Sequence, residues 1–386
     1  MDNNKIRMAM VGGGEGAFIG AIHRIAARLD GQIELVAGVF SRYPKKCLST
    51  GQQLGLDPSR CYHDYETLFR EEAQLPQSQR MQFVAIVTPN HLHFPIASAA
   101  IKYGFHVLSD KPATLTLAQA LMLQNQLSDT HCLYGLTQTY TGYPMVKEAR
   151  HRIATGALGT VKKIVVEYSQ GWLANTNDET SKQASWRLDA KKSGISCCMG
   201  DIGVHAANLA EYVSGLEVNA LCADLNTVVA GRTLDDDGTV LLRFNNGAKG
   251  VLMASQIAVG EENNLKLRIY GEKASIEWAQ MEPNNLWLRE QNAPAQLIRT
   301  GVGNLCPAAS KATRTPAGHP EGYLEAFANI YLNFAEMIQA HCQNNAVQNQ
   351  DFDVPGIKEA VRGMAFIENA VVASAQDTKW HPFTIG

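Results

Sequence analysis

The sequence predicts an α/β protein in two parts: a doubly wound parallel sheet over residues 1–140, followed by an α+β part over residues 141–386 with a largely antiparallel, open sheet. Two observations lead to this prediction. In the first part, short and continuous apolar strands alternate with helical segments, which is typical of a parallel sheet covered on both faces. In residues 218–300, strand-like segments with two-residue alternation of apolar and polar side chains dominate, which is typical of antiparallel strands.

Strand and helix alternate through the whole first part. Continuous apolar segments predict strands at residues 6–11, 34–40, 83–87, 106–108 and 133–137. Helical spacing or a helix-starting proline predicts helices at residues 20–29, 44–55, 65–69, 95–103 and 114–127. Asp64 stands directly before the third of these helices, where its side chain can cap the first turn.

The second part changes character. Its helices are predicted at residues 144–155, 323–342 and 355–375. A strand is predicted at residues 161–168, and the pairs Asn246-Gly247 and Gly271-Glu272 predict hairpin turns further on. We expect the final helices to pack back on the first domain.

Composition narrows the class of protein. The 386 residues are 45% hydrophobic and 18% charged, which is enough apolar surface for two ordered cores. A net charge of −3 without a basic run argues against nucleic acid as a partner. No signal-peptide pattern and no apolar run of about 18 residues is present, so we expect a cytoplasmic protein that makes no membrane contact. The eight cysteines lack metal-ligand spacing, so we expect reduced thiols and no metal site.

A glycine-rich turn follows the first strand, in the stretch "VGGGEGAFIG". Gly12 and Gly14 form a G-x-G pair, and Gly20 lies in the helix that follows. Glycines let the backbone approach a pyrophosphate, and the helix N-terminus favours phosphate charge. This context favours dinucleotide binding. If Gly20 takes the place of the third glycine of the usual motif, residues 15–17 are an insertion.

The second strand ends without the acid that would hold the ribose 2′-hydroxyl of NAD. Ser41 and Arg42 stand there instead, with Lys45 and Lys46 close behind. A hydroxyl and a guanidinium suit a 2′-phosphate. We therefore expect NAD or NADP as the cofactor, with NADP slightly favoured; a solvated basic loop is the alternative interpretation.

Three further stretches carry a family resemblance. They are "VTPNHLHFPIA" at residues 87–97, "SDKPATLTLAQA" at 109–120, and "WRLDAKKSG" followed by "GDIGVHAANLAEYVSG" within 186–215. Together with the glycine-rich turn, and in this order, they resemble the Gfo/Idh/MocA family of sugar and cyclitol dehydrogenases. The resemblance implies an N-terminal Rossmann domain. It also implies a C-terminal domain whose open sheet often forms the oligomer interface, so we expect a homodimer or homotetramer.

The resemblance also implies site residues. The family's E-K-P lysine maps to Lys111, and its D-x-x-x-H pair maps to Asp201 and His205. The chain departs from the family in its longer glycine turn, in Asp110 where glutamate is usual, and in Asn208 where many members have aspartate. The remaining candidates for cofactor binding are Thr88, Pro89, Asn90, His93, Asp110, Lys111, Trp186 and Arg187. Lys111, Tyr140, Asp201, His205 and His319 are the candidates for substrate binding.

Several of these residues have equally simple structural explanations. His91 and His93 fit solvent-facing loop positions as well as cofactor contact, and Tyr140 fits packing between domains as well as the cleft. His319 fits a plain turn before a helix. Asp201 fits a helix N-cap, and His205 fits a buried histidine with satisfied hydrogen bonds.

The chemistry of alcohol oxidation explains the catalytic choices. A secondary hydroxyl must lose a hydride to a nicotinamide and a proton to a base. His205 is the candidate base because imidazole titrates near neutral pH. Asp201, four residues earlier, shares a helix face with it if the segment is helical from its start, and then orients the ring or binds a second hydroxyl. Lys111 can stabilise negative charge on the reacting oxygen.

The sequence therefore predicts an NAD(P)-dependent oxidoreductase acting on a secondary hydroxyl of a sugar, glycoside or cyclitol. Two alternatives stay open at this point. One is a redox-neutral, NAD-dependent glycoside hydrolase of the same family, and the other is a non-catalytic nucleotide or sugar sensor.

Overall fold

The computed structural model describes residues 5–175, 182–343 and 346–386. These residues form two compact units, and each is described by itself. Unit 1 comprises residues 1–137 and 327–361, and unit 2 comprises residues 138–326 and 362–386. The two long helices α11 (Tyr323–Cys342) and α12 (Ile357–Ser374) each contribute residues to both units. The sequence predicts a domain boundary at residue 140. The first segment of unit 1 ends at residue 137, and its second segment, residues 327–361, lies near the end of the chain.

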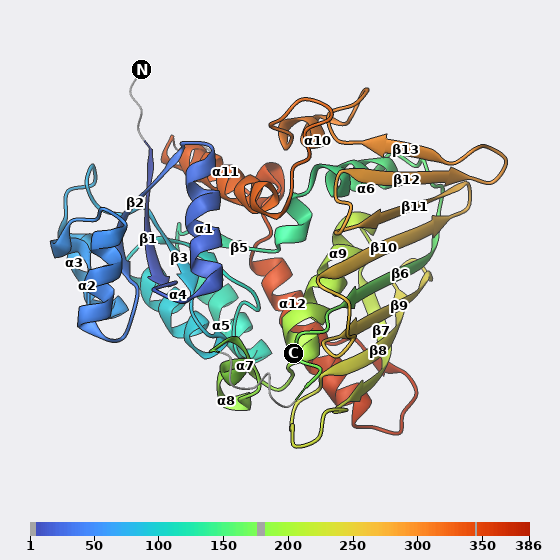
Figure 1. Cartoon of the computed structure of the whole chain (residues 1–386), viewed down its shortest axis with the longest axis horizontal. Coiled ribbons are helices and arrows are strands. Elements are labelled where there is room, and N and C mark those ends of the chain that lie inside the picture. The colour runs from blue at the N-terminus through green and yellow to red at the C-terminus, as the bar shows by residue number, and fades with distance from the viewer. Residues whose placement is uncertain (1–4, 176–181, 344–345) are drawn as a thin grey trace. The chain divides into compact units, whose positions relative to one another are not determined.

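Unit 1 is built on a parallel sheet of five strands in the order β2-β1-β3-β4-β5 (Figure 1). The strands are β1 (Ile6–Gly12), β2 (Ile33–Val39), β3 (Phe83–Val87), β4 (His106–Ser109) and β5 (Tyr134–Leu136). The pairs β1–β2, β1–β3, β3–β4 and β4–β5 are all parallel. The chain order reverses direction at β1, so the sheet is doubly wound, as the alternation predicted.

Helices cover both faces of this sheet. They are α1 (Phe18–Leu29), α2 (Pro44–Gln53), α3 (Tyr65–Gln74), α4 (His93–Lys102) and α5 (Leu117–Ser128). Strand residues such as Val84 and Ile86 share a buried cluster with Phe69 of α3 and Ala97 of α4. On the other face, the ring of Phe83 lies 5.5 Å from that of Phe334 in α11. Alternate residues of β3 therefore face different helices, which explains why the whole strand is apolar.

Two local features predicted from the sequence are present in the structure: the Asp64 cap and the hairpin turn at Gly247. The backbone N–H of Thr67 donates to the side chain of Asp64 at 2.6 Å, which caps α3. Gly247, at φ +88°, lies in the turn that joins two antiparallel strands of unit 2. These features form where they do because they depend on neighbours in the chain rather than on distant contacts.

Unit 2 is built on a sheet of nine strands in the order β13-β12-β11-β10-β6-β9-β8-β7-β14. The strands are β6 (Val161–Ser169), β7 (Val218–Asn226), β8 (Asp237–Phe244), β9 (Lys249–Ser255), β10 (Asn264–Gly271), β11 (Ala274–Ala279), β12 (Asn285–Glu290), β13 (Gln296–Arg299) and β14 (His381–Pro382). All neighbours pair antiparallel except β6 and β9, which are parallel. The prediction of a largely antiparallel second sheet is confirmed.

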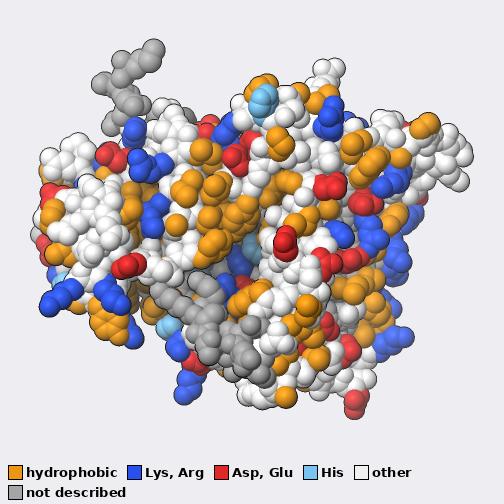
Figure 2. Space-filling model, viewed as in Figure 1, with side chains coloured by type: hydrophobic (Ala, Val, Ile, Leu, Met, Phe, Trp, Pro, Cys, Tyr) orange, Lys and Arg blue, Asp and Glu red, His pale blue; other side chains and the backbone are white. Residues whose placement is uncertain are grey.

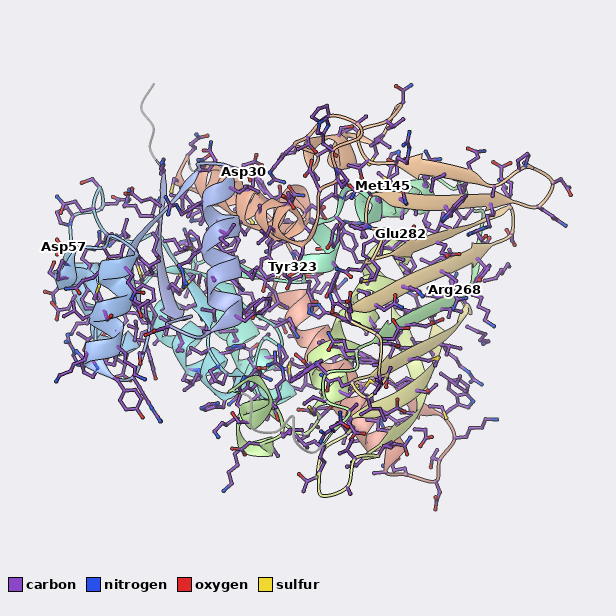
Figure 3. The ribbon with its side chains drawn as sticks, in the orientation of Figure 1. Asp30, Asp57, Met145, Arg268, Glu282 and Tyr323 are labelled. Atoms are coloured by element: carbon purple, nitrogen blue, oxygen red, sulfur yellow. The ribbon has the colours of Figure 1, made fainter. Side chains whose placement is uncertain are left out.

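One face of the unit 2 sheet is buried under helices and the other is open. The α-helices that lie wholly within unit 2 are α6 (Pro144–Ala154), α7 (Lys182–Arg187), α8 (Ala190–Ser193), α9 (Val204–Ser214) and α10 (Pro307–Lys311). Among these, α9 packs on β6, β9 and β10, and α6 packs on β11 and β12. Figure 2 shows charged and hydrophobic side chains mixed along the margin formed by these strands. Arg268 of β10, labelled in Figure 3, forms an ion pair with Glu167 of β6.

Two kinds of feature are absent from the described part of the chain. No helix within residues 5–175, 182–343 and 346–386 has the length and apolar character needed to cross a membrane. The same residues contain no group of three or more His, Cys, Asp and Glu side chains that could hold a metal ion.

A buried carboxylate ties together the part of unit 1 that precedes β3. Glu72 of α3 is fully buried and accepts hydrogen bonds from Arg60 Nε at 2.9 Å and from Arg60 Nη2 at 2.6 Å. It also accepts from the Tyr62 hydroxyl at 3.0 Å and the Met81 backbone N–H at 2.8 Å. Removing one partner of such a network leaves the other charge buried and unpaired.

We therefore expect Glu72→Ala to lower the free energy of unfolding by about 3–5 kcal/mol, measured by urea denaturation of the full chain. The control is the neighbouring Glu71→Ala. Glu71 is paired with Arg70 at the surface, and its removal should cost less than about 1 kcal/mol. Equal losses for the two variants would contradict this role of Glu72.

Candidate functional site

The glycine-rich turn of unit 1 joins the end of β1 to the start of α1. Gly12 has φ +94°, which a residue with a side chain rarely adopts. A Cβ added at Gly20 would lie 2.2 Å from the Cα of Gly13, so the first turn of α1 packs directly on the loop backbone. The backbone N–H of Ala17 donates to the carbonyl of Gly14 at 3.0 Å and closes the turn. Gly20 therefore holds the helix against the loop, which is the third glycine's task in dinucleotide-binding turns.

Arg24 of α1 also contacts this loop, and this contact was not predicted from the sequence. Its Nη1 donates to the carbonyl oxygen of Gly13 at 2.6 Å. Arg24 lies four residues after Gly20 on the same helix, so it is on the loop-facing side. The four-residue spacing from Gly20 was the only feature of the sequence that could have predicted this contact.

The loop fits the pyrophosphate of a dinucleotide. It lies at the carboxyl end of a central strand, and its glycines let the turn pack tightly on the neighbouring strand ends, because a Cβ at Gly12 would lie 2.5 Å from the carbonyl oxygen of Val87 and a Cβ at Gly14 would lie 2.3 Å from that of Phe40. The first turn of α1 carries no acidic side chain that would oppose phosphate charge. On these grounds Gly12, Gly14 and Gly20 are the residues that would hold this part of a cofactor.

The end of β2 carries the basic surface expected from the sequence. Ser41 Oγ accepts from the backbone N–H of Tyr43 at 3.2 Å. Arg42 is exposed; its guanidinium carbon lies 4.9 Å from the centre of the Tyr43 ring, and its Nη2 donates to the Tyr43 hydroxyl at 2.9 Å. Lys46 Nζ lies 5.7 Å from the same ring. Two cations thus share one aromatic side chain at this strand end.

The loop after β3 contains Thr88, Pro89 and Asn90, and one expected site residue, His93, follows it. His93, at the start of α4, is 1% exposed. Its Nδ1 lies 2.7 Å from the carbonyl oxygen of Pro112, and its Nε2 lies 2.7 Å from the carbonyl oxygen of Thr88. Burial lowers the pKa of the ring. Both nitrogens thus face backbone oxygens of the loops that follow β3 and β4, and the neutral ring donates to one of the two; cofactor contact by His93 stays a prediction.

Asp110 holds the backbone that carries Lys111. Its Oδ1 accepts from the backbone N–H of Lys111 at 2.8 Å and from Thr137 Oγ1 at 2.9 Å. Lys111 is half-buried, two residues beyond the end of β4, and its peptide bond to Pro112 is cis. The aspartate that stands in place of the family's glutamate therefore fixes the position of Lys111 from inside unit 1.

A buried histidine lies behind Asp110. His23 of α1 is fully buried; its Nε2 lies 3.9 Å from Asp110 Oδ2, and its Nδ1 lies 2.7 Å from the hydroxyl of Tyr331 in α11. Burial lowers the pKa of His23 to about 4, although the nearby Asp110 opposes this. The ring is therefore neutral at neutral pH and serves to pack α1 against α11.

In unit 2, Asp201 does not lie on a regular α-helix with His205. The segment Met199–Gly203 is a π-helical turn, and α9 begins only at Val204. The segment is therefore helical from its start, although π-helical around Asp201, and a shared helix face for the Asp201–His205 pair stays a prediction. Asp201 is also not an N-cap residue, because Cys198 and Gly203 occupy the N-cap positions of this turn and of α9.

Asp201 instead joins a charged group within unit 2. Its Oδ2 accepts from Arg187 Nε at 3.0 Å and from Gln256 Nε2 at 3.0 Å. The guanidinium of Arg187 lies 4.4 Å from the Trp186 ring and 5.7 Å from the Trp172 ring. Of the W-R pair found in the sequence, Arg187 thus holds the Asp201 carboxylate and Trp186 lies against the guanidinium, whereas the contact with Gln256 was not predicted.

His205 is buried in the first turn of α9, with 8% of its surface exposed. Its Nδ1 lies 2.9 Å from the Oε1 of Gln138. The Tyr140 ring meets it nearly at right angles, 4.9 Å between ring centres, and the Tyr168 ring is 6.4 Å away. The ring of His205 therefore contacts the Gln138 amide oxygen and the rings of Tyr140 and Tyr168.

Tyr140 and Tyr168 have hydrogen bonds of their own. The hydroxyls of Tyr140 and Tyr168 bond to each other, and Tyr168 donates to Asn263 Oδ1 at 2.7 Å. Asn263 Nδ2 in turn donates to the Tyr140 hydroxyl at 3.1 Å. Burial raises the pKa of both tyrosines, so both stay neutral. Tyr140 is 4% exposed, and its hydroxyl already has these partners within unit 2.

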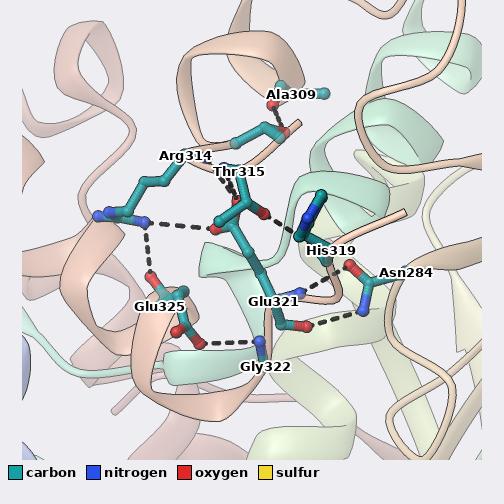
Figure 4. Close-up of polar contacts among 9 residues, drawn as sticks. Asn284, Ala309, Arg314, Thr315, His319, Glu321, Gly322 and Glu325 are labelled. Carbon is teal, nitrogen blue, oxygen red and sulfur yellow. Dashed lines mark hydrogen bonds and ion pairs between the residues drawn. The ribbon is translucent and has the colours of Figure 1, made fainter. Parts of the chain in front are cut away.

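His319 lies on an exposed turn built around the buried Glu321 (Figure 4). Glu321 Oε1 accepts from the backbone N–H of Thr315 at 2.7 Å. The Thr315 hydroxyl donates to the carbonyl oxygen of His319 at 2.7 Å. The backbone of His319 is therefore well held, and substrate contact by its side chain stays a prediction.

Residues of both units match models of known protein families. Residues 6–138 match the model of an oxidoreductase family with an NAD-binding Rossmann fold, and residues 146–277 match the GFO/IDH/MocA C-terminal domain. The oxidoreductase YfiI of Bacillus subtilis (strain 168) is 33% identical over 98% of this chain and 97% of its own. Levoglucosan dehydrogenase of Pseudarthrobacter phenanthrenivorans (strain DSM 18606 / JCM 16027 / LMG 23796 / Sphe3) is 28% identical over 77% of this chain and 78% of its own.

Solved structures agree with these relatives. An inositol dehydrogenase homologue from Azotobacter vinelandii is 34% identical to this chain in two crystal structures. Its complex with NAD+ has a TM-score of 0.93 and covers 98% of this chain and 97% of its own. Its complex with NADH and myo-inositol has a TM-score of 0.91 and covers 98% of both chains.

The packing of Gly20 on the loop gives a testable prediction. A methyl group at residue 20 has no room, so Gly20→Ala should push α1 from the loop and weaken NADH binding at least about tenfold, measured by NADH fluorescence titration. The control is Gly322→Ala, because the nearest atom to a methyl group there lies at an ordinary 3.8 Å. Unchanged NADH affinity in Gly20→Ala would remove this turn from the cofactor site.

Proposed function

We propose, since the chain belongs to the Gfo/Idh/MocA family of oxidoreductases, that it transfers a hydride between a nicotinamide cofactor and a secondary hydroxyl of a sugar, glycoside or cyclitol. The observation that carries the proposal is the buried imidazole of His205, held at Nδ1 by a neutral amide, in a chain that also has a dinucleotide-type glycine turn. Levoglucosan dehydrogenase and the myo-inositol complex of the Azotobacter homologue support a polyol substrate.

In the proposed reaction, His205, Lys111 and Asp201 each act on a different part of the substrate. When bound, the nicotinamide ring supplies the site that accepts or returns the hydride. His205 removes the hydroxyl proton during oxidation and returns it during reduction. The ammonium of Lys111 donates a hydrogen bond to the reacting oxygen and stabilises the negative charge that develops there. Asp201, whose Oδ2 is held by Arg187 and Gln256, accepts a hydrogen bond from a second hydroxyl.

The first test is turnover. Reduction of NAD and NADP, followed by the absorbance of the reduced nicotinamide, is measured across a panel of monosaccharides, glycosides and inositols. We expect net formation of reduced cofactor with at least one polyol. Glycoside cleavage without net reduction would instead identify the redox-neutral hydrolase, and coenzyme binding without any turnover would identify a sensor.

Lys111 and His205 are tested on the best substrate of that panel. Lys111→Ala and His205→Asn should each lower kcat/KM by about 100-fold or more, because a charge-stabilising donor or the acid/base group is lost. NADH affinity should change little in His205→Asn. The exposed Lys102→Ala, in the same unit as Lys111, serves as the control with normal turnover. Wild-type turnover in either site variant would refute its catalytic role.

We further propose that the cofactor site accepts NADP as well as NAD. The exposed Arg42 and the Ser41 hydroxyl stand where an acid would repel a 2′-phosphate. A hydrogen bond to a charged group contributes about 1.5–3 kcal/mol, so Arg42→Ala should lower kcat/KM for NADP by about tenfold or more while NAD changes little. Arg28→Ala, exposed at the end of α1, is the control. An equal effect on both coenzymes would place Arg42 outside the 2′-phosphate site.

A further inference from the structure

We infer that Gln138 is a positioning residue for His205: its side-chain oxygen keeps the proton of the neutral ring on Nδ1 and so makes Nε2 the nitrogen that exchanges protons with the substrate. This inference rests on the proposed function for its kinetic consequence. The arrangement of the two side chains can be tested without it.

The contact is short and enclosed. Gln138 Oε1 lies 2.9 Å from His205 Nδ1, although 67 residues separate the two in the chain. Gln138 is 1% exposed, so water does not compete for its amide oxygen. The residue follows the last strand of the parallel sheet and directly precedes the short helical turn Thr139–Gly142. The backbone carbonyl of Gln138 accepts hydrogen bonds from the backbone N–H of Thr141 at 3.0 Å and from the Thr141 hydroxyl at 2.9 Å. These bonds anchor the backbone of Gln138.

An amide oxygen can only accept a hydrogen bond. The imidazole nitrogen that faces it must therefore carry a proton, in the neutral ring and in the imidazolium alike. In the neutral ring the lone pair then resides on Nε2. Because this partner suits both protonation states, the ring can gain and lose a proton at Nε2 without turning.

The Gln138 side chain is also neutral, so it adds no charge beside the His205 ring. Among the described residues, Tyr140 and Tyr168 lie against the His205 ring and stay neutral, and Asp201, four residues earlier in the chain, is paired with Arg187. A carboxylate at residue 138 would add a second negative charge and favour the imidazolium. A glutamine orients the ring without adding that charge.

The tautomer is tested directly in the protein without substrate. In the wild type labelled with ¹⁵N-histidine, His205, assigned by its loss in His205→Asn, should show a protonated Nδ1 and an unprotonated Nε2 at neutral pH. Gln138→Met keeps the length of the side chain but removes the acceptor, so the His205 signals should shift towards a mixture of tautomers. A protonated Nε2 in the wild type, or no change in Gln138→Met, would overturn the inference whatever the enzyme's substrate is.

Kinetics on the best polyol of the panel provide the second arm. Gln138→Met should lower kcat by about tenfold or more with NADH affinity retained. Gln138→Glu restores an acceptor and should recover much of kcat, but the rising limb of its pH–rate profile should move to higher pH, because the added carboxylate favours the imidazolium and deprotonation of the base then needs higher pH. Gln126→Met is the control, since that amide donates to the carbonyl of Ser98 in unit 1.

The outcomes separate the two claims. Loss of turnover in His205→Asn with wild-type kinetics in Gln138→Met and Gln138→Glu would overturn the role of Gln138 and leave the proposed function intact. Full turnover in His205→Asn would overturn the proposed function, while the nitrogen signals would still decide the tautomer. If Gln138→Met fails to fold, an unshifted pH profile in Gln138→Glu overturns the inference on its own.

Discussion

The carboxyl edge of the parallel sheet in unit 1 is the constraint on which the candidate cofactor site depends. Parallel strands end at the same edge, so residues far apart in the sequence are presented together. Gly12 ends β1, Arg42 follows β2, Thr88 follows β3 and Lys111 follows β4. None of these residues needs a long-range contact of its own side chain to reach the edge, because the strand pairing places its backbone there.

The loops at this edge are rigid because buried polar groups hold their backbones. His93 bridges the carbonyls of Thr88 and Pro112, and Asp110 accepts from the backbone of Lys111 and from Thr137. A buried polar group is stabilising only when its partners are present, so each loop is held in one conformation. In unit 2 the corresponding contacts join side chains instead of backbone: Asp201 accepts hydrogen bonds from Arg187 and Gln256.

Much of this architecture could be predicted from the sequence, and the failures share a physical cause. The strand–helix alternation, the Asp64 cap and the last two helices depend on neighbouring residues, and all of them formed. The contact between Gln138 and His205 joins distant segments, so no local pattern reveals it. The π-helical turn before α9 also escaped prediction, because such turns are rare and no local pattern in the sequence separates them from an α-helical turn.

Burial alone does not distinguish a structural histidine from a catalytic one, and the partners of each ring decide the matter. Among the described residues, His23, His93 and His205 are the buried histidines. A base must gain and lose a proton near the working pH, and burial lowers the pKa of His23 to about 4, which leaves it without a proton to exchange there. Both nitrogens of His93 face backbone carbonyls. Of these three, His205 alone meets the amide oxygen of a neutral side chain, which fixes one nitrogen as a donor, and this contact supports the proposal that the other nitrogen transfers protons.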